Sequence, residues 1–163
     1  MGVFGNEYII RSINEDTSSM DKDRGKIKLY YVTEQDLSGK RKYPSIPSNE
    51  LTKEGLMDNT EQRIPFSLSI DGALSAQGNK ILNKVFYVFV PNKYVNYYKP
   101  TTQQVPYQQI TEEVWLKSPV VLNCIGRIQV TQRLDAKEFT YGDNKKAKLY
   151  RWKYKWISNT AGN

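Results

Sequence analysis

The chain has 163 residues, of which 24 are Lys or Arg and 17 are Asp or Glu, so its formal net charge is +7. This length suits one domain with a sizeable core, and 39% hydrophobic with 25% charged residues is typical of a globular protein. The sequence has no histidine and one cysteine, Cys124, which excludes Ser-His-Asp and Cys-His catalysis, histidine-ligated zinc and intrachain disulfides.

The positive charge is concentrated at one end of the chain. Residues 144–163 contain six basic side chains and no acidic one, whereas the first 143 residues contain 18 basic and 17 acidic side chains. The body of the protein is therefore close to neutral, and the excess belongs to the last predicted strand.

The first predicted elements are strands. Residues 7–13 are rich in β-branched and aromatic side chains, and residues 26–33 alternate, with Ile27, Leu29 and Tyr31 on one face. Both patterns are typical of strands, and the second indicates a strand with one buried face.

Residues 34–63 differ from the rest of the chain, because they have few large apolar side chains and contain Pro44 and Pro47 close together. A structureless loop of this length is uncommon inside a compact domain. We expect either an extended arm that lies on a partner or a plain surface loop. A short helical turn over residues 48–57 is compatible with both, although Gly55 weakens it.

Two further strands are predicted in the middle of the chain. Residues 66–71 alternate between apolar and polar side chains, and residues 84–90 are apolar on both faces. The second pattern predicts a central strand that is covered on both sides. Residues 72–83, between them, fit a helix and a loop about equally.

Residues 92–119 combine tyrosines with Gln and Asn and are broken by prolines, so we predict a Tyr/Gln-rich interface loop. Tyrosine offers a large contact area at small entropic cost and keeps a polar tip. Packing over the sheet is the alternative for the same rings. Pro106 and the spacing of the apolar residues after it predict one short amphipathic helix here. The interface candidates are Tyr94, Tyr97, Tyr98, Tyr107 and Trp115.

The last third of the chain predicts a long strand over residues 120–132 and a terminal hairpin with strands at 138–141 and 147–158. Within the long strand, Gly126 indicates a bulge or bend. The strand's apolar face is expected to contain Leu122, Cys124, Ile128 and Val130.

About seven strands, mostly adjacent in sequence and without long helices between them, determine the predicted fold class. We expect residues 1–163 to form a single, mainly β domain, an antiparallel sandwich or barrel with one or two short helices and a long polar arm.

The terminal strand has two different faces. Alternation places aromatic side chains on one face and a basic face on the other. Bases stack on aromatic rings that lie beside a basic groove, and a solvated basic face with aromatic core residues behind it is the alternative. Since the two kinds of side chain point apart, we favour the alternative over direct contact with nucleic acid. The aromatic row is Tyr150, Trp152, Tyr154 and Trp156, and the basic face is Lys148, Arg151, Lys153 and Lys155.

Enzymatic chemistry finds little support in the sequence. Asp135 and Lys137 are similar to the acidic-x-Lys ending of metal-dependent nucleases, but those enzymes need further converging carboxylates, and this two-residue pattern is common by chance. Cys124 lies on an apolar strand face, where cysteine behaves as a small hydrophobe. We therefore expect a protein that is not an enzyme, with no catalytic residue, cofactor or metal.

A histidine-free β domain with a polar arm at 34–63 and a Tyr/Gln-rich segment at 92–119 resembles a virion structural protein of a tailed bacteriophage. In size and character it is similar to head–tail connector, neck-ring and tail components. The resemblance covers the whole chain and is carried by overall character, with no diagnostic motif. It implies a subunit of the virion, assembled in the host cytoplasm, that repeats around a symmetric ring.

The partners that this resemblance implies are further copies of the chain and neighbouring virion proteins, with non-specific DNA contact through the basic face. We expect no membrane association, because no apolar run approaches the roughly 20 residues that span a bilayer and the first residues lack a signal-peptide pattern. The alternative function is a single-stranded nucleic-acid-binding β-barrel protein.

Overall fold

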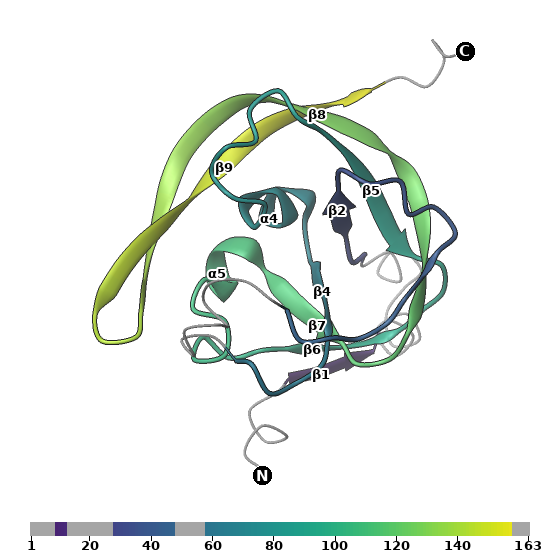
Figure 1. Cartoon of the computed structure of the whole chain (residues 1–163), viewed down its shortest axis with the longest axis horizontal. Helices are drawn as coiled ribbons and strands as arrows, with labels where there is room; N and C mark the ends of the chain where they lie inside the picture. The colour runs from purple at the N-terminus through teal and green to yellow at the C-terminus, as the bar shows by residue number, and fades with distance from the viewer. Residues whose placement is uncertain (1–8, 13–27, 48–57, 158–163) are drawn as a thin grey trace, which may run out of the picture.

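The computed structural model describes residues 9–12, 28–47 and 58–157, and side-chain surroundings only within the second and third ranges. The fold is mainly β, with antiparallel sheets in a sandwich-like or barrel-like arrangement and two short helices in the described part of the chain (Figure 1), which confirms the predicted fold class. Neither helix of the described part is long and apolar enough to cross a bilayer.

Within the described residues, nine strands form two antiparallel sheets. The four-stranded sheet has the order β1-β6-β7-β4, and the five-stranded sheet has the order β2-β5-β8-β3 with β9 paired to β8. The strands are β1 Ile9–Ser12, β2 Tyr31–Thr33, β3 Arg41–Lys42, β4 Ile64–Ser67, β5 Val85–Pro91, β6 Asn96–Lys99, β7 Glu113–Leu116, β8 Val120–Tyr141 and β9 Lys145–Ile157.

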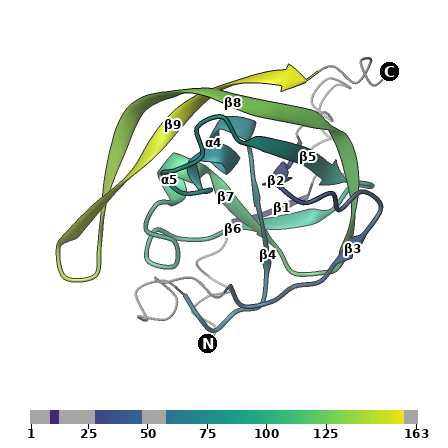
Figure 2. The same cartoon turned by 45° about the horizontal axis from the view of Figure 1, so that its top comes forward.

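Two short helices, α4 (Ile70–Ser75) and α5 (Gln108–Thr111), lie between the sheets and the long hairpin of β8 and β9 (Figures 1 and 2). Helix α4 begins where the Ser69 hydroxyl accepts a hydrogen bond from the Gly72 N–H, at 2.9 Å. A side chain at Gly72 would lie 2.2 Å from the Thr111 carbonyl oxygen, so only glycine allows the two helices to approach this closely.

The predicted segment at 92–119 is not a loop. It contains β6, α5 and β7, and β6 and β7 pair with each other inside the four-stranded sheet. The helix predicted after Pro106 is present as α5. The prediction was wrong because tyrosine and glutamine are common in loops, whereas here Tyr98 and Tyr107 pack into a small core of their own around Val105 and Trp115.

The described parts of the predicted arm or loop, residues 34–47 and 58–63, follow the protein's own sheets. Strand β3 pairs with Val120 and Val121 of β8, and Ser45 forms a β-bridge with Arg63. The helical turn that the sequence allows over residues 48–57 lies outside the described residues.

Strand β5 is covered on both faces, as predicted. Phe86 and Val88 pack into one hydrophobic core with α4 and β9, whereas Phe89 packs into the other core between the two sheets. The two faces of β5 therefore point into two different hydrophobic cores, and neither face points to solvent.

A bulge in β8 decides which core each residue of that strand enters. Opposite the adjacent residues Val88 and Phe89 of β5 stand Gly126 and Cys124, so Ile125 is the extra residue. Gly126 adopts a φ of +149°, which glycine tolerates and which places the predicted bulge at this residue.

Because of the bulge, the prediction that four apolar residues of this strand share one face is wrong. Leu122 and Cys124 contact the core between the sheets, whereas Ile128 and Val130 enter the core under α4. The sequence pattern placed all four on one face because strict alternation holds only without an inserted residue.

Strands β8 and β9 form a long curved hairpin that wraps over both helices (Figures 1 and 2). Their pairing runs from Arg127 and Ile157 to Tyr141 and Lys145, with two further irregularities on the way. The predicted terminal hairpin is therefore present and longer than expected, because the strand predicted over 120–132 continues without a break to Tyr141.

Candidate functional site

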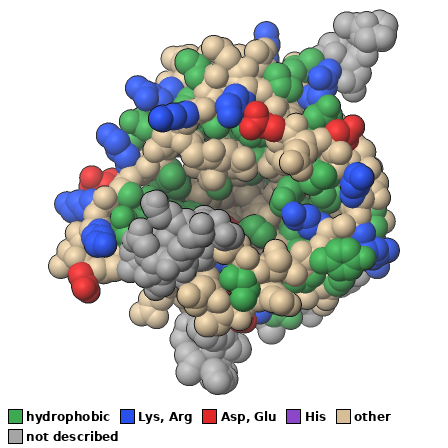
Figure 3. All heavy atoms as spheres, in the orientation of Figure 1, with side chains coloured by type: hydrophobic (Ala, Val, Ile, Leu, Met, Phe, Trp, Pro, Cys, Tyr) green, Lys and Arg blue, Asp and Glu red, His purple; other side chains and the backbone are tan. Residues whose placement is uncertain are grey.

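The basic face predicted on the terminal strand is exposed. Lys148, Arg151, Lys153 and Lys155 are all solvent-exposed on β9. Figure 3 shows Lys and Arg side chains spread over the part of the molecule where Figure 1 places this hairpin. Arg151 donates a hydrogen bond from Nε to Oδ1 of Asp135 at 2.7 Å, which is the main reason that the pKa of Asp135 lies below its usual range.

The aromatic row of the same strand mostly belongs to the core. Trp152 is buried, and Tyr150 and Tyr154 pack against the same cluster under α4. Trp156 differs, since 49% of its surface is exposed. A stacking surface for bases on this strand would therefore consist of Trp156 alone.

The five interface candidates separate into buried and exposed positions. Tyr97 and Trp115 are buried and cannot form part of an external surface, which corrects the prediction for these two rings. Tyr98 and Tyr107 are partly buried against Trp115 in the small core. Tyr94, with 48% of its surface exposed, is the one candidate that faces solvent to a large extent.

A cluster of buried charges around Arg63 is a feature that sequence reasoning missed. The side chains of Arg63 and Asp58 form an ion pair of 3.0 Å between Nη1 and Oδ2, and both are almost completely buried. The Arg63 guanidinium also lies over the Trp115 ring, with Cζ 4.1 Å from the ring centroid. No sequence signal marked Arg63, because it ends a polar segment in which charged residues are expected to face water.

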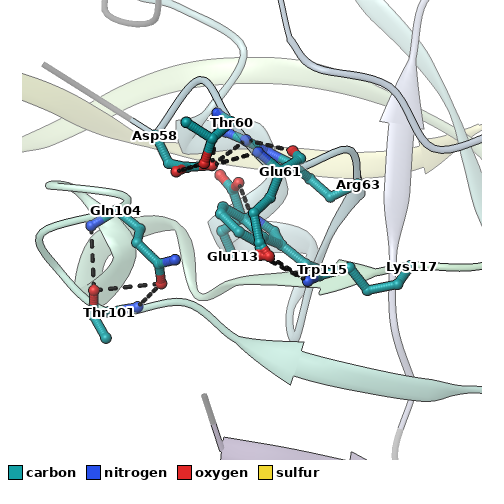
Figure 4. Close-up of polar contacts among 9 residues, drawn as sticks. All are labelled: Asp58, Thr60, Glu61, Arg63, Thr101, Gln104, Glu113, Trp115 and Lys117. Carbon is teal, nitrogen blue, oxygen red and sulfur yellow. Dashed lines mark hydrogen bonds and ion pairs between the residues drawn. The ribbon is translucent and has the colours of Figure 1, made fainter. Parts of the chain in front are cut away.

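Glu113 of β7 completes this buried charge cluster (Figure 4). Its Oε2 accepts a hydrogen bond of 2.8 Å from Nε1 of Trp115. Burial raises the pKa of Glu113, while the Trp115 N–H and the charge of Arg63 act in the opposite direction. Burial, with the nearby charge of Glu113, also raises the pKa of Tyr107.

The polypeptide around the cluster is held by further polar contacts (Figure 4). The Asp58 N–H donates to the carbonyl oxygen of Gln104, whose side-chain oxygen accepts from the Thr101 N–H at 2.9 Å. At the partly exposed edge, Lys117 forms an ion pair of 2.8 Å with Glu61. These contacts hold residues 58–63 against the turn at 101–104 and against the residue that follows β7, in addition to the contact of Arg63 with Trp115.

No protein-family model matches the chain, and no curated protein or solved structure matches it. Function is therefore inferred from the chain's own residues. Within residues 28–47 and 58–157, no group of three or more metal-ligating side chains lies close enough together to hold a metal ion. Asp135, the acidic residue of the nuclease-like pattern, forms ion pairs with Arg151 and Lys137.

Two features remain as candidates for binding. One is the exposed basic hairpin of β8 and β9, which offers strand edges and positive charge. The other is a pocket of about 290 Å³ between β2, β4, α4 and α5, which Glu113 and Tyr107 connect to the buried charge cluster.

Proposed function

We propose that the chain is a non-enzymatic structural subunit that assembles with further copies of itself into a symmetric ring. The setting that we propose is the head–tail connector, neck or tail of a tailed-bacteriophage virion, on the resemblance in overall sequence character. The β8–β9 hairpin supports the assembly role best, because it carries long hydrogen-bonding edges that have no strand partner within the described residues.

The unpaired edges follow from the strand register. Strand β5 pairs with β8 only as far as Gln129, whereas β9 continues along β8 to Tyr141. Val130 still exchanges backbone hydrogen bonds with Asn83 and Lys84, and beyond it the hairpin is a two-stranded ribbon in which β9 has no described strand partner other than β8. Such an edge can pair with a strand of a neighbouring subunit, and head-to-tail pairing around an axis closes a ring.

The charge of the ribbon limits what it can pair with. Lys145, Lys146 and Lys148 lie near its tip and are exposed, and Lys153 and Lys155 follow along β9. Lysine on an edge strand suppresses unspecific edge-to-edge pairing. An acidic surface on the neighbouring subunit would attract the same lysines, so we expect the ribbon to contact acidic residues of its neighbour.

A shortened hairpin tests the proposal. Removing residues 138–141 together with residues 145–148 deletes four paired positions and keeps the turn Gly142–Asn144 and the remaining register. Native mass spectrometry and light scattering should find a closed oligomer for the full chain and a monomer for the shortened variant. A monomeric full chain, or equal assembly of both proteins, would contradict the proposal.

A matched variant separates assembly from folding. The deletion also removes Phe139, whose ring centroid lies 5.5 Å from that of Tyr107. Phe139→Ala removes this contact but keeps the ribbon, so it should assemble like the full chain. If Phe139→Ala is monomeric too, the hairpin's position on its own domain, and not its edges, controls assembly.

A second candidate function is binding of single-stranded nucleic acid, and it is favoured by Trp156, which is exposed next to Lys155. Binding of a fluorescent oligonucleotide should then weaken steeply with salt and be lost in Trp156→Ala. Trp152→Ala is not informative for stacking because that ring is buried. Absence of binding at low salt would remove this candidate.

A further inference from the structure

A third candidate for binding is a cleft between the β8–β9 ribbon and the two helices. It has a volume of about 490 Å³, opens to solvent, and is lined by residues of α4, α5, β8 and β9 and of the helix ends. Figures 1 and 2 show the ribbon wrapping over both helices. The volume lies within the range of small-molecule sites, so the cleft has room for a molecule of the size of an amino acid or a dipeptide.

Two aromatic contacts hold the ribbon against the domain on either side of this cleft. Trp152 of β9 is buried in the core under α4. Nearer the tip of the ribbon, the ring of Phe139 packs edge-on against Tyr107, with 5.5 Å between the centroids. Lys137 and Arg151 lie between these two contacts along the ribbon and line the cleft. The separation of the walls is therefore set by packing on both sides, and not by attraction between the charges that face the cleft.

The charged side chains of the cleft are divided between its two walls. Asp71 of α4 and Glu112, which ends α5, line the helix side. Lys137 of β8 and Arg151 of β9 line the ribbon side. Within the described residues, the two basic side chains form their ion pairs with Asp135 of the ribbon itself, and no ion pair crosses the cleft. The cleft therefore has a negative wall and a positive wall of equal formal charge.

Asp135 orients the guanidinium of Arg151 and leaves its terminal nitrogens available. Oδ1 of Asp135 accepts a hydrogen bond from Nε of Arg151 at 2.7 Å, and Asp135 itself does not line the cleft. In the part of the chain that the structure describes, the two Nη groups of Arg151 donate no hydrogen bond. A guanidinium binds a carboxylate best through two parallel N–H donors, and the Nη1/Nη2 pair can still do so.

The helix side offers one carboxyl group that is held in place and one that is available. The Ser69 hydroxyl donates a hydrogen bond to Oε1 of Glu112 and accepts one from the Gly72 N–H, so Glu112 is tied to the start of α4. The Asp71 carboxylate is exposed and forms no hydrogen bond or ion pair with the described residues. Asp71 is therefore the carboxylate that an ammonium group can reach.

We propose that this cleft binds a small zwitterion, with its carboxylate on the Nη1/Nη2 pair of Arg151 and its ammonium group on Asp71. The two poles of such a molecule match the two walls, whereas a simple anion or cation is attracted by one wall and repelled by the other. The inference does not depend on the assembly role, because the cleft lies between one face of the ribbon and the helices, whereas assembly uses the ribbon's edges. Free amino acids and short peptides both carry the two groups.

Amide chemical shifts of the full chain, titrated with matched probes, test this site. The probes are alanine and alanyl-alanine, each also as its N-acetyl form, its amide and the form with both ends blocked. We expect at least one unblocked probe to bind in a saturable way and to shift the amides of Gly72, Ser75 and Gln109, which line the cleft. Its dissociation constant should be about 1 mM, since Lys137 and Arg151 are about half exposed and exposed ionic contacts are weak.

The blocked probes decide whether both poles are recognised. Each singly blocked form should bind about fivefold more weakly than its zwitterion, which is the effect of losing one exposed ionic contact. Equal binding of the doubly blocked form would overturn the proposal. So would shifts that map outside the cleft, or the absence of saturable shifts with both zwitterions up to about 10 mM.

Variants assign each pole to its residue. Arg151→Gln should remove most of the preference for the zwitterion over its amide, and Asp71→Asn most of the preference over the N-acetyl form. Lys153→Gln is the matched control, because this exposed residue of the same strand does not line the cleft, and it should keep both preferences. Unchanged preferences in Arg151→Gln and Asp71→Asn, or an equal loss in Lys153→Gln, would overturn the proposal. If a variant does not fold, the blocked probes on the unmodified chain still decide.

The same titrations identify the source of the ligand. Tighter binding of alanine supports a free amino acid. Tighter binding of alanyl-alanine supports a short peptide, because its charged groups are farther apart and can span a wider cleft.

Discussion

The guanidinium of Arg63 lies over the indole of Trp115, and the indole N–H in turn donates a hydrogen bond of 2.8 Å to Glu113. This arrangement joins a segment with few apolar residues to strand β7 through a buried cation, an aromatic ring and two carboxyl groups. Because buried charges are costly unless they are paired, the contact between Arg63 and Trp115 makes the position of residues 58–63 depend on β7.

Removing the charge of Arg63 is expected to destabilise the fold strongly. Arg63→Met leaves Asp58 buried without its ion pair, and loss of one partner of such a pair costs about 3–5 kcal/mol in the free energy of unfolding. Chemical denaturation measures the change. The control Lys117→Met breaks the partly exposed pair with Glu61 and should cost about 1 kcal/mol or less. Similar losses in both variants would contradict a special role for Arg63.

The two buried tryptophans should respond differently to the same substitution. Trp115→Phe removes a hydrogen bond to a buried carboxyl group, which costs about 2–3 kcal/mol. The Nε1 of Trp152 is buried without a hydrogen-bond partner in the described part of the chain, so Trp152→Phe loses no such bond. We expect its cost in the free energy of unfolding to be lower than that of Trp115→Phe by about 1 kcal/mol or more. Thermal unfolding of both variants tests the order, and a larger loss for Trp152→Phe would contradict it.

Deleting the bulge residue of β8 should be tolerated. Without Ile125, Cys124 and Gly126 become adjacent and still stand opposite Phe89 and Val88, so both halves of the strand keep their faces. We expect this variant to unfold cooperatively within about 2 kcal/mol of the parent.

Deleting Asn123 is the matched control for the bulge. This deletion shifts Leu122 by one position relative to the bulge and turns it away from its core, since a one-residue slip exchanges the two faces of a strand. Circular dichroism during heating should therefore show a folded protein for the Ile125 deletion and a largely unfolded one for the Asn123 deletion. The opposite order would show that the bulge is required.

Glu113 should make the stability depend on pH in a defined direction. Burial raises its pKa above the ordinary value of 4.5, so the folded protein keeps a proton that the unfolded chain loses. The contribution of Glu113 to the free energy of unfolding therefore falls as pH rises above about 4.5 and levels off above the folded-state pKa.

Urea unfolding of the parent and of Glu113→Gln, compared between about pH 4 and pH 8, isolates this contribution because other groups cancel in the difference. The stability of the parent relative to the variant should decrease with rising pH. A difference that increases with pH would mean that Arg63 and Trp115 outweigh burial and that the pKa of Glu113 is lowered.

By itself, the sequence determined the mainly antiparallel β fold, the central position of β5, the bulge at Gly126 and the terminal hairpin with its basic face. Each of these depends on local information, namely the period of two in apolar side chains, the conformational freedom of glycine, and turn residues between adjacent strands. The exposed state of Lys153 and Lys155, like the buried state of Trp152, follows from the same alternation.

Only the tertiary structure decided where Arg63, Glu113 and Trp115 lie. Composition indicates a polar segment and a tyrosine-rich loop, but the burial of these residues comes from the pairing of β4 with β7, which brings Ile64 opposite Leu116 across more than fifty positions of the chain. The charge of the protein divides in the same way. The excess on the last strand is visible in the sequence, whereas the buried charge cluster becomes visible only once β4 and β7 have paired, because that pairing brings Arg63 over Trp115 and close to Glu113.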